Sequence, residues 1–97
     1  MTLFDHDNYN GDAITVSINP GECTNVLEFN NRTTSVKISE GCVRLWLDSD
    51  CKGGALDVHA PGESDLQTKD FNDKVSSVSF CQDLCVNFRG KFIKNPT

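Results

Sequence analysis

The sequence predicts an all-β protein, a β-sandwich made of two Greek-key units with four short strands each. Three observations lead to this fold class. Hydrophobic residues alternate with polar ones over several short segments, which is the period of strands. Residues typical of turns, namely Asn, Asp, Gly and Pro, separate these segments. The same order of residue types then occurs twice in the 97 residues, at a fixed offset of 42 positions.

The offset of 42 positions aligns the two halves of the chain without a gap. Identical residues occur at Leu3/Leu45, Gly11/Gly53, Ala13/Ala55, Val16/Val58, Phe29/Phe71, Asn30/Asn72, Ser35/Ser77 and Val36/Val78. Conservative changes occur at Phe4/Trp46, Ile14/Leu56, Glu28/Asp70, Asn31/Asp73, Arg32/Lys74 and Thr34/Ser76. We therefore expect one supersecondary unit of about 40 residues that is used twice.

Strands are expected where the alternation is clearest. These segments are 14–18 and 36–38 in the first half, and 43–47, 56–58 and 78–80 in the second half. The stretches 7–11 and 48–53 are rich in turn residues and are predicted to be links within hairpins. A single helical turn is expected only near 64–69.

A single small domain fits this length. We predict that it covers residues 1–80, with the first Greek key at 1–41 and the second at 42–80. Residues 81–97 fall outside the repeat and form a C-terminal extension. Within it, Cys85–Phe88 is expected to add an edge strand and Lys91–Thr97 to be frayed.

Composition and charge exclude several classes of function. The formal net charge of -5 and the pI of about 4.7 argue against binding to nucleic acids or to anionic membranes, both of which require clustered Lys and Arg. No apolar run approaches the roughly 18 residues of a membrane helix, so no membrane insertion is expected. Residues 1–7 lack the basic and then apolar pattern of a signal peptide.

Two six-residue segments, 30–35 and 72–77, carry the strongest chemical signal. They read Asn-Asn-Arg-Thr-Thr-Ser and Asn-Asp-Lys-Val-Ser-Ser, and each is preceded by Phe and followed by Val. Each segment places amide, carboxylate and hydroxyl oxygens in one short turn. Hard cations prefer ligand sets made only of oxygen, so calcium binding is the leading hypothesis.

These segments also carry a family resemblance. Phe4 to Gly11 is similar to the aromatic-x4-aromatic-x-Gly signature that opens a Greek key of the βγ-crystallin superfamily. Trp46 to Gly53 is the second copy, with Cys51 in place of the second aromatic residue. The two hexapeptides resemble the calcium motif of this superfamily, Asn/Asp-Asn/Asp-x-x-Ser/Thr-Ser. The resemblance covers residues 1–80, and all four motifs occur in the expected order.

The resemblance implies two calcium sites that are shared between the two halves, with waters completing the 6–8 oxygens that calcium takes. One site would use Thr34, the carbonyl of Asp5, Asp73 and the carbonyl of Lys74. The other would use Ser76, the carbonyl of Leu47, Asn31 and the carbonyl of Arg32. The first site contains one formal negative charge and the second contains none, so the second departs from the Asp-bearing pattern. Loops of this composition also occur without an ion, because their side chains cap turns.

Five cysteines are many for a chain of this length: Cys23, Cys42, Cys51, Cys81 and Cys85. Two disulfides and one free thiol would suit an extracellular protein, and the localisation leans that way. Reduced cysteines that fill small apolar sites are the intracellular alternative. The sequence does not determine the pairing. No C-x2-C pair is present, so the spacing does not indicate zinc.

An enzyme is not predicted. His6 lies between two acidic residues, but adjacent residues of a strand point in opposite directions. His59 is expected to be an exposed surface residue, and no cysteine lies in a recognisable activating context.

Two classes of function remain. One is a calcium-binding structural or stress-type domain that the ion stabilises. The other is a small secreted interaction protein, such as a protease inhibitor or an antimicrobial toxin; its protein partner is unknown.

Overall fold

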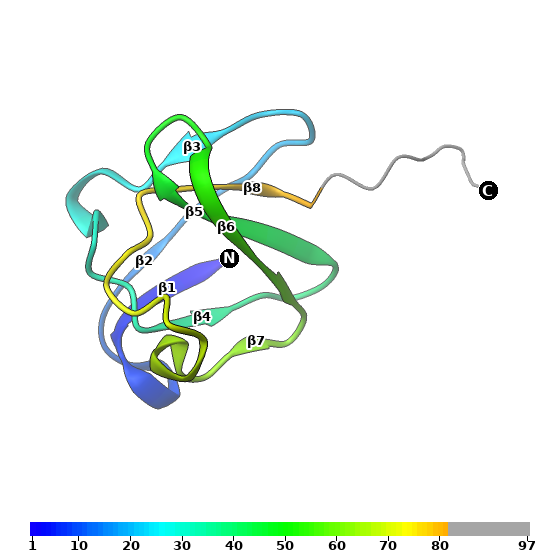
Figure 1. Cartoon of the computed structure of the whole chain (residues 1–97). Coiled ribbons are helices and arrows are strands. Elements are labelled where there is room, and N and C mark those ends of the chain that lie inside the picture. The colour runs from blue at the N-terminus through cyan, green and yellow to red at the C-terminus, as the bar shows by residue number, and fades with distance from the viewer. Residues whose placement is uncertain (82–97) are drawn as a thin grey trace.

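The computed structural model describes residues 1–81, and the predictions for Cys85–Phe88 and Lys91–Thr97 lie outside this range. Two antiparallel four-stranded sheets make up the structure (Figure 1). The first sheet has the order β2-β1-β4-β7, with the bounds Asn10–Thr15, Thr2–His6, Ser35–Lys37 and Gly62–Glu63. The second sheet has the order β3-β8-β5-β6, with the bounds Thr24–Asn25, Ser77–Phe80, Cys42–Asp48 and Lys52–His59. The predicted all-β sandwich is confirmed.

The two halves of the chain exchange their third strands. β3 belongs to the first half but pairs with β8 of the second half, through Thr24 opposite Val78. β7 belongs to the second half but pairs with β4 of the first half, through Val36 opposite Glu63. Each sheet therefore contains three strands from one half and one from the other, which is a Greek-key arrangement.

Three short 3-10 helices connect the strands: η1 at Asp7–Tyr9, η2 at Leu27–Phe29 and η3 at Leu66–Lys69. η3 falls where the sequence predicted a single helical turn. The side chain of Asp65 caps η3 by accepting a hydrogen bond from the amide of Gln67 at 2.9 Å. Among the described residues, no helix is long and apolar enough to cross a membrane.

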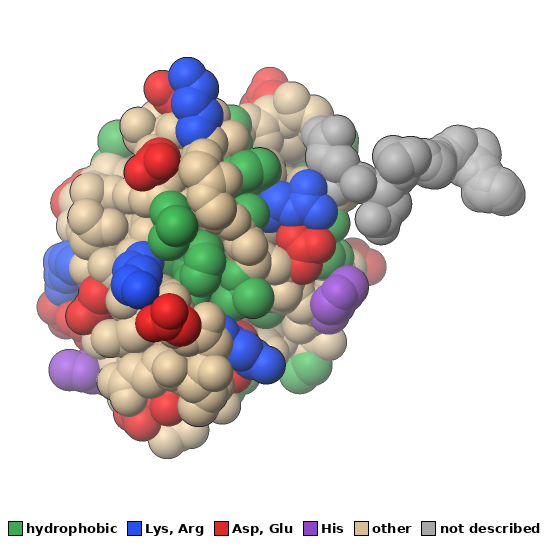
Figure 2. All heavy atoms as spheres, in the orientation of Figure 1, with side chains coloured by type: hydrophobic (Ala, Val, Ile, Leu, Met, Phe, Trp, Pro, Cys, Tyr) green, Lys and Arg blue, Asp and Glu red, His purple; other side chains and the backbone are tan. Residues whose placement is uncertain are grey.

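One hydrophobic core fills the space between the sheets. Its members are Leu3, Val16, Val26, Phe29, Val36, Ile38, Val43, Leu45, Val58, Leu66, Phe71, Val75 and Val78. Most of them come from the alternating segments, because one face of each strand points inward. On the outside, acidic and basic side chains are scattered over the visible face, with a strip of hydrophobic side chains between them (Figure 2).

Two expected strand features differ in the structure. Val43 and Leu45 are buried as the alternation predicts, but Leu47 is 37% exposed. The register between β5 and β6 shifts after Trp46, and an irregularity of this kind turns the following residue off the inner face. β2 ends at Thr15, before the last residues of the expected 14–18 strand, although Val16 still exchanges two backbone hydrogen bonds with Met1.

Two disulfides join distant parts of the described chain. Cys23 is bonded to Cys51, and Cys42 is bonded to Cys81. The first disulfide connects the segment before β3 to the β5–β6 hairpin, and the second connects the start of β5 to the residue after β8. The expectation of two disulfides agrees with this pairing, which the sequence left open.

Candidate metal centre

The β1–β2 and β5–β6 hairpins fold back on themselves in the same way. In the first hairpin Asn8, Tyr9 and Gly11 have φ angles of 55°, 62° and 84°. The residues 42 positions later are Asp50, Cys51 and Gly53, with φ angles of 60°, 56° and 80°. The φ angle of 84° favours glycine at position 11, and a Cβ atom there would also displace the Asp5 carboxylate, whose Oδ1 would be 2.1 Å away.

Aromatic packing closes the first hairpin but not the second. The rings of Phe4 and Tyr9 meet edge to face, with centroids 5.8 Å apart. In the second hairpin Cys51 replaces the second aromatic residue and forms the disulfide to Cys23, while Trp46 Nε1 donates to Ser79 Oγ at 3.0 Å. Cys51 thus bonds the tip of the second hairpin to the segment before β3, where the first hairpin has ring packing within itself.

A buried serine ends each oxygen-rich segment and holds one hairpin. Ser35 Oγ donates to the carbonyl of His6 at 2.6 Å and accepts from the amide of Tyr9 at 3.1 Å. Ser77 Oγ makes the equivalent bonds to the carbonyl of Asp48 at 2.6 Å and from the amide of Cys51 at 2.9 Å. These two serines are not among the ligands that the sequence predicts. Each one fixes a hairpin next to the loop that precedes β4 or β8.

The two oxygen-rich loops lie beside each other. The amide of Asn31 donates to the carbonyl of Val75 at 3.0 Å, and the amide of Asp73 donates to the carbonyl of Thr33 at 2.9 Å. Asn31 and Asp73 have φ angles of 61° and 58°, in the left-handed region that Asn and Asp tolerate better than most residues. This backbone geometry explains why an amide or a carboxylate residue occupies the second position of each segment.

Three of the four expected ligand atoms of the first site lie close together. Thr34 Oγ1 is 3.1 Å from the carbonyl oxygen of Asp5 and 3.5 Å from Asp73 Oδ1. With Ca–O distances of 2.3–2.6 Å, neighbouring ligand oxygens around calcium are roughly 2.8–3.5 Å apart. The fourth expected ligand, the carbonyl of Lys74, belongs to the residue that follows Asp73. The donor set is entirely oxygen, and the two distances from Thr34 Oγ1 fall within this range.

In the second site the structure brings one pair of expected side-chain ligands together. Ser76 Oγ lies 3.5 Å from Asn31 Oδ1. The amide of Ser76 donates to the carbonyl of Trp46 at 2.9 Å, as the amide of Thr34 donates to the carbonyl of Phe4 at 2.8 Å. The two expected carbonyl ligands belong to the next residues along the chain: Leu47 follows Trp46, and Arg32 follows Asn31.

The third residues of the two hexapeptides, Arg32 and Lys74, form different ion pairs. Arg32 Nη2 lies 2.9 Å from Asp5 Oδ2 and 3.5 Å from Asp12 Oδ2, and its guanidinium group packs on the ring of Phe29. The hydrogen bond from Arg32 is the main reason that the pKa of Asp5 is below its usual value. At the corresponding position Lys74 contacts only the exposed side chain and the carbonyl of Asp70, at 3.3 Å, among the contacts of the described chain.

The two loops contain more polar oxygens than their own hydrogen bonds use. Within residues 1–81, two buried side-chain oxygens have no hydrogen-bond partner, Thr33 Oγ1 and Asn72 Oδ1, and both belong to the hexapeptides. Buried polar atoms of this kind are uncommon in proteins and indicate a ligand or a water at the loops.

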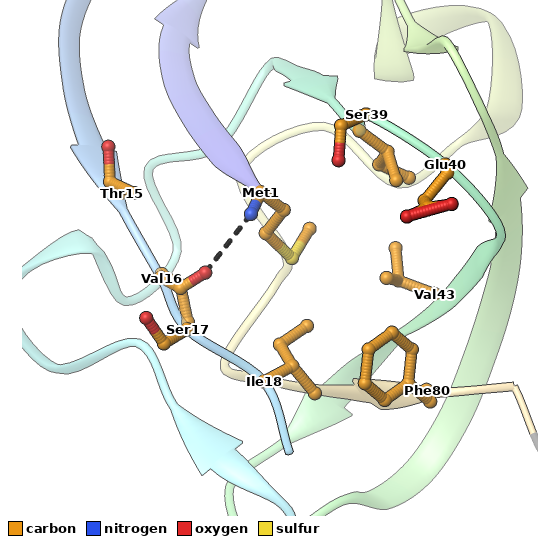
Figure 3. Close-up of a pocket in the computed structure, with 10 residues that line it drawn as sticks. Met1, Thr15, Val16, Ser17, Ile18, Ser39, Glu40, Val43 and Phe80 are labelled. Carbon is orange, nitrogen blue, oxygen red and sulfur yellow. Dashed lines mark hydrogen bonds between the residues drawn. The ribbon is translucent and has the colours of Figure 1, made fainter. Parts of the chain in front are cut away.

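An open hollow lies at the other ends of the strands. Met1, Val16, Ile18, Val43 and Phe80 line it, with Glu40 at one side (Figure 3). These residues lie just before β1, near the start of β5, after the end of β2 and at the last residue of β8, whereas the oxygen-rich loops precede β4 and β8. The hollow is therefore separate from the candidate metal centre.

Comparison with known proteins agrees with this architecture. No family model matches the sequence, and no curated protein matches it. Among solved structures, a βγ-crystallin from an archaeon matches with a TM-score of 0.70 and 16% identity, over 82% of this chain and 94% of that chain. A βγ-crystallin from Ciona intestinalis matches with a TM-score of 0.69 and 17% identity, over 82% and 96%. A βγ-crystallin domain from Flavobacterium johnsoniae matches with a TM-score of 0.67 and 24% identity, over 88% and 97%.

The protein has the βγ-crystallin fold. The matches cover most of the chain and nearly the full length of these three structures, and they agree with the fold that the four sequence motifs indicated.

Proposed function

We propose that this protein binds calcium between its two Greek-key halves and that the ion stabilises the fold. The observation that carries the proposal is the position of Thr34 Oγ1, which lies within 3.1–3.5 Å of the Asp5 carbonyl and of Asp73 Oδ1. These three oxygens come from β1, from the loop before β4 and from the loop before β8. An ion held by them would connect both halves of the chain.

Each residue has a distinct part in such a site. Asp73 supplies the one negative charge, and the left-handed backbone at this residue directs its side chain toward Thr34. Thr34 now donates its hydroxyl proton to the Asp5 carbonyl, so this proton would turn away when the oxygen acts as a ligand. Lys74 would add a carbonyl. A bound calcium ion supplies two positive charges that offset the repulsion between these oxygens.

The second site, with Ser76, Asn31 and the carbonyls of Leu47 and Arg32, is proposed to be weaker. Its amide ligand carries no charge, and a cation without a charged partner gains less on leaving water. We therefore expect two binding events of different strength in one protein.

A small secreted interaction protein is the alternative function. The two disulfides are compatible with it, because disulfides persist in oxidising compartments. They are equally compatible with a calcium-stabilised domain. The alternative predicts that the stability of the protein does not depend on calcium.

Calcium titration of chelator-treated protein by calorimetry tests the proposal, together with thermal unfolding in calcium and in chelator. At calcium about 100-fold above the dissociation constant, one site should add roughly 2.7 kcal/mol to the free energy of unfolding. For a domain near 100 residues, the melting temperature should rise by about 10 °C or more. Asp7→Ala is a matched control that removes an exposed carboxylate near the site and should keep the full shift. An equal melting temperature in millimolar calcium and in chelator would refute the proposal.

A further inference from the structure

A second group of side chains that can bind metals lies on the outer face of the β3-β8-β5-β6 sheet, around the Cys42–Cys81 disulfide. Cys42 and His59 are directly opposite each other on β5 and β6, and Cys42 Sγ is 3.9 Å from His59 Nε2. Asp57 lies two residues before His59, on the same face of β6. One ligand atom each from Cys42, Asp57 and Cys81 lie within 4.8 Å of one another. Two sulfurs and one carboxylate therefore meet at one point of the surface, and the His59 imidazole lies beside one of the two sulfurs.

The neighbourhood holds these side chains in place. The amide of Cys81 donates to the carbonyl of Cys42 at 3.2 Å, so the two cysteines lie on adjacent strands. Arg44 donates to both carboxylate oxygens of Asp57, at 2.6 and 3.0 Å. The cysteines are half-buried, whereas Asp57 and His59 are exposed. A cation from solution can thus reach the group, and the carboxylate is already oriented.

We propose that reduction of the Cys42–Cys81 disulfide creates a zinc site, with Cys42, Cys81 and His59 as ligands and Asp57 as the fourth. Zinc is bound by cysteine sulfur, histidine nitrogen and carboxylate oxygen in tetrahedral sites. This site is independent of the proposed calcium function, because its residues lie outside both oxygen-rich loops.

The distance between Cys42 and His59 is close to the one that zinc requires, and side-chain rotation has to bring the remaining ligands together. With Zn–S near 2.3 Å and Zn–N near 2.0–2.1 Å, tetrahedral geometry requires about 3.6 Å between sulfur and nitrogen ligands. Cys42 Sγ and His59 Nε2 are already 3.9 Å apart. Two sulfur ligands require about 3.8 Å between them. Side-chain rotation can supply this separation once the S–S bond is broken, because the Cα atoms of Cys42 and Cys81 are 5.5 Å apart.

The chemistry balances with a dithiol as the reductant. The dithiol gives two electrons and two protons to the S–S bond, which becomes two thiols, while the dithiol closes to its own disulfide. Zinc then displaces the two thiol protons to the solvent. Two thiolates and the Asp57 carboxylate give three negative charges, which the zinc ion and the Arg44 guanidinium together neutralise. The thiolates are soft ligands and select zinc over calcium.

Cobalt titration of the reduced full-length protein tests the site, because tetrahedral cobalt bound to thiolates has a distinct absorption spectrum. The protein is treated with a phosphine reductant and a chelator, then desalted and titrated with Co2+ and afterwards with Zn2+. One equivalent of cobalt should give the thiolate charge-transfer band, and zinc should abolish it. The oxidised protein should give no such band.

Variants identify the ligands. His59→Ala should lower the affinity for zinc by more than the roughly 10–100-fold that loss of an outer-shell partner costs. His6→Ala removes the other histidine of the chain and should leave the affinity unchanged. A protein with Cys23→Ser and Cys51→Ser together should keep the cobalt band, and so should Cys85→Ser. Loss of the band in either serine variant, or an unchanged affinity in His59→Ala, would overturn the proposal.

Alkylation followed by mass spectrometry gives a second readout on the reduced native protein. One equivalent of Zn2+ should slow the alkylation of Cys42 and Cys81 but not that of Cys23 and Cys51. Equal protection of all four cysteines, or of none, would contradict the site. The site would also be contradicted if the reduced protein unfolded, as judged by loss of its circular dichroism, and did not refold when Zn2+ was added.

Discussion

Arg32 and Asp5 form an ion pair at 2.9 Å that connects the two candidate calcium sites. The carbonyl of Asp5 is an expected ligand of the first site, and the carbonyl of Arg32 is an expected ligand of the second. The side chains of the same two residues hold each other at the surface. The guanidinium group of Arg32 also brings positive charge next to the first site. This ion pair therefore affects both the stability of the protein and the affinity of its metal centre.

The pH dependence of stability should reveal this ion pair. The pKa of Asp5 is lowered from its ordinary value of 3.8, mainly by the hydrogen bond from Arg32. Folding is thus favoured by the ionised carboxylate above this value, and the benefit is lost as the pH falls through the lower pKa of the folded state. Arg32→Gln should reduce the melting temperature at neutral pH, and the difference from the wild type should shrink below pH 3.8.

Thermal unfolding between neutral and strongly acidic pH, in chelator, measures this difference. Lys74→Gln is the matched control, because Lys74 occupies the corresponding position but contacts Asp70, whose side chain is 97% exposed. Such exposed pairs contribute little to stability. A destabilisation by Arg32→Gln that stays constant over the whole pH range would show that lost packing on Phe29 is its cause.

Removing Asp73 should cost more than removing Asn31. Asp73→Ala takes away a charge as well as a ligand and should abolish the stronger calcium binding event. Asn31→Ala should affect only the weaker event. Calorimetric titration of both variants with calcium distinguishes the two events. Equal losses in the two variants would mean that the ligands are assigned to the wrong positions.

Adding a charge to the second site should strengthen it. Asn31→Asp gives this site the carboxylate that the first site has, and Asp tolerates the φ angle of 61° at this position. The affinity of the weaker binding event should rise, and the calcium-dependent shift in melting temperature should grow. An unchanged weak event would indicate that the positive charge of Arg32 offsets the added carboxylate.

The buried serine of the second hairpin should be essential for stability even without calcium. Ser77→Ala leaves the amide of Cys51 and the carbonyl of Asp48 without their partner. Because both bonds are only partly buried, the total loss should stay within the roughly 1–3 kcal/mol that one unsatisfied buried group costs. Denaturation in urea with chelator present should show a loss in this range. Ser49→Ala, an exposed position in the same hairpin, should have almost no effect. A loss that appears only in calcium would assign Ser77 to the metal centre instead.

Cysteine labelling should distinguish the redox states of the protein. After purification from its native source, alkylation under denaturing and non-reducing conditions should modify one of the five cysteines, Cys85, because the other four form disulfides. Labelling of all five would show that the protein exists in a reducing compartment. Peptide mapping by mass spectrometry identifies the labelled position.

Much of the fold could be predicted because its signals are local. Alternation in segments such as 43–47 indicates a strand with one buried face, and turn residues around Gly11 and Gly53 indicate the hairpins. The partners of β3 and β7 could not be predicted. Each of these strands has two residues, and so short a segment carries no alternation.

The candidate calcium ligands could be named because the family motif has fixed spacing, and the structure brings Thr34, Asp5 and Asp73 within hydrogen-bond range. The Cys42–Cys81 group could not be found in the same way. Its members are 39 residues apart in the sequence, and only the pairing of β5 with β6 and β8 brings them together. Spacing rules for zinc recognise ligands that are neighbours along the chain.

The exchange of β3 and β7 has a consequence for how the protein unfolds. Neither half can complete a sheet with its own strands, and the Cys23–Cys51 disulfide fastens the exchanged segment of the first half to the second. When the Cys23–Cys51 disulfide is reduced, cutting the chain near Gly41 should therefore give two fragments that remain disordered alone and assemble into one native structure when mixed. The intact protein should melt in a single cooperative transition, because both Greek keys share one folding unit.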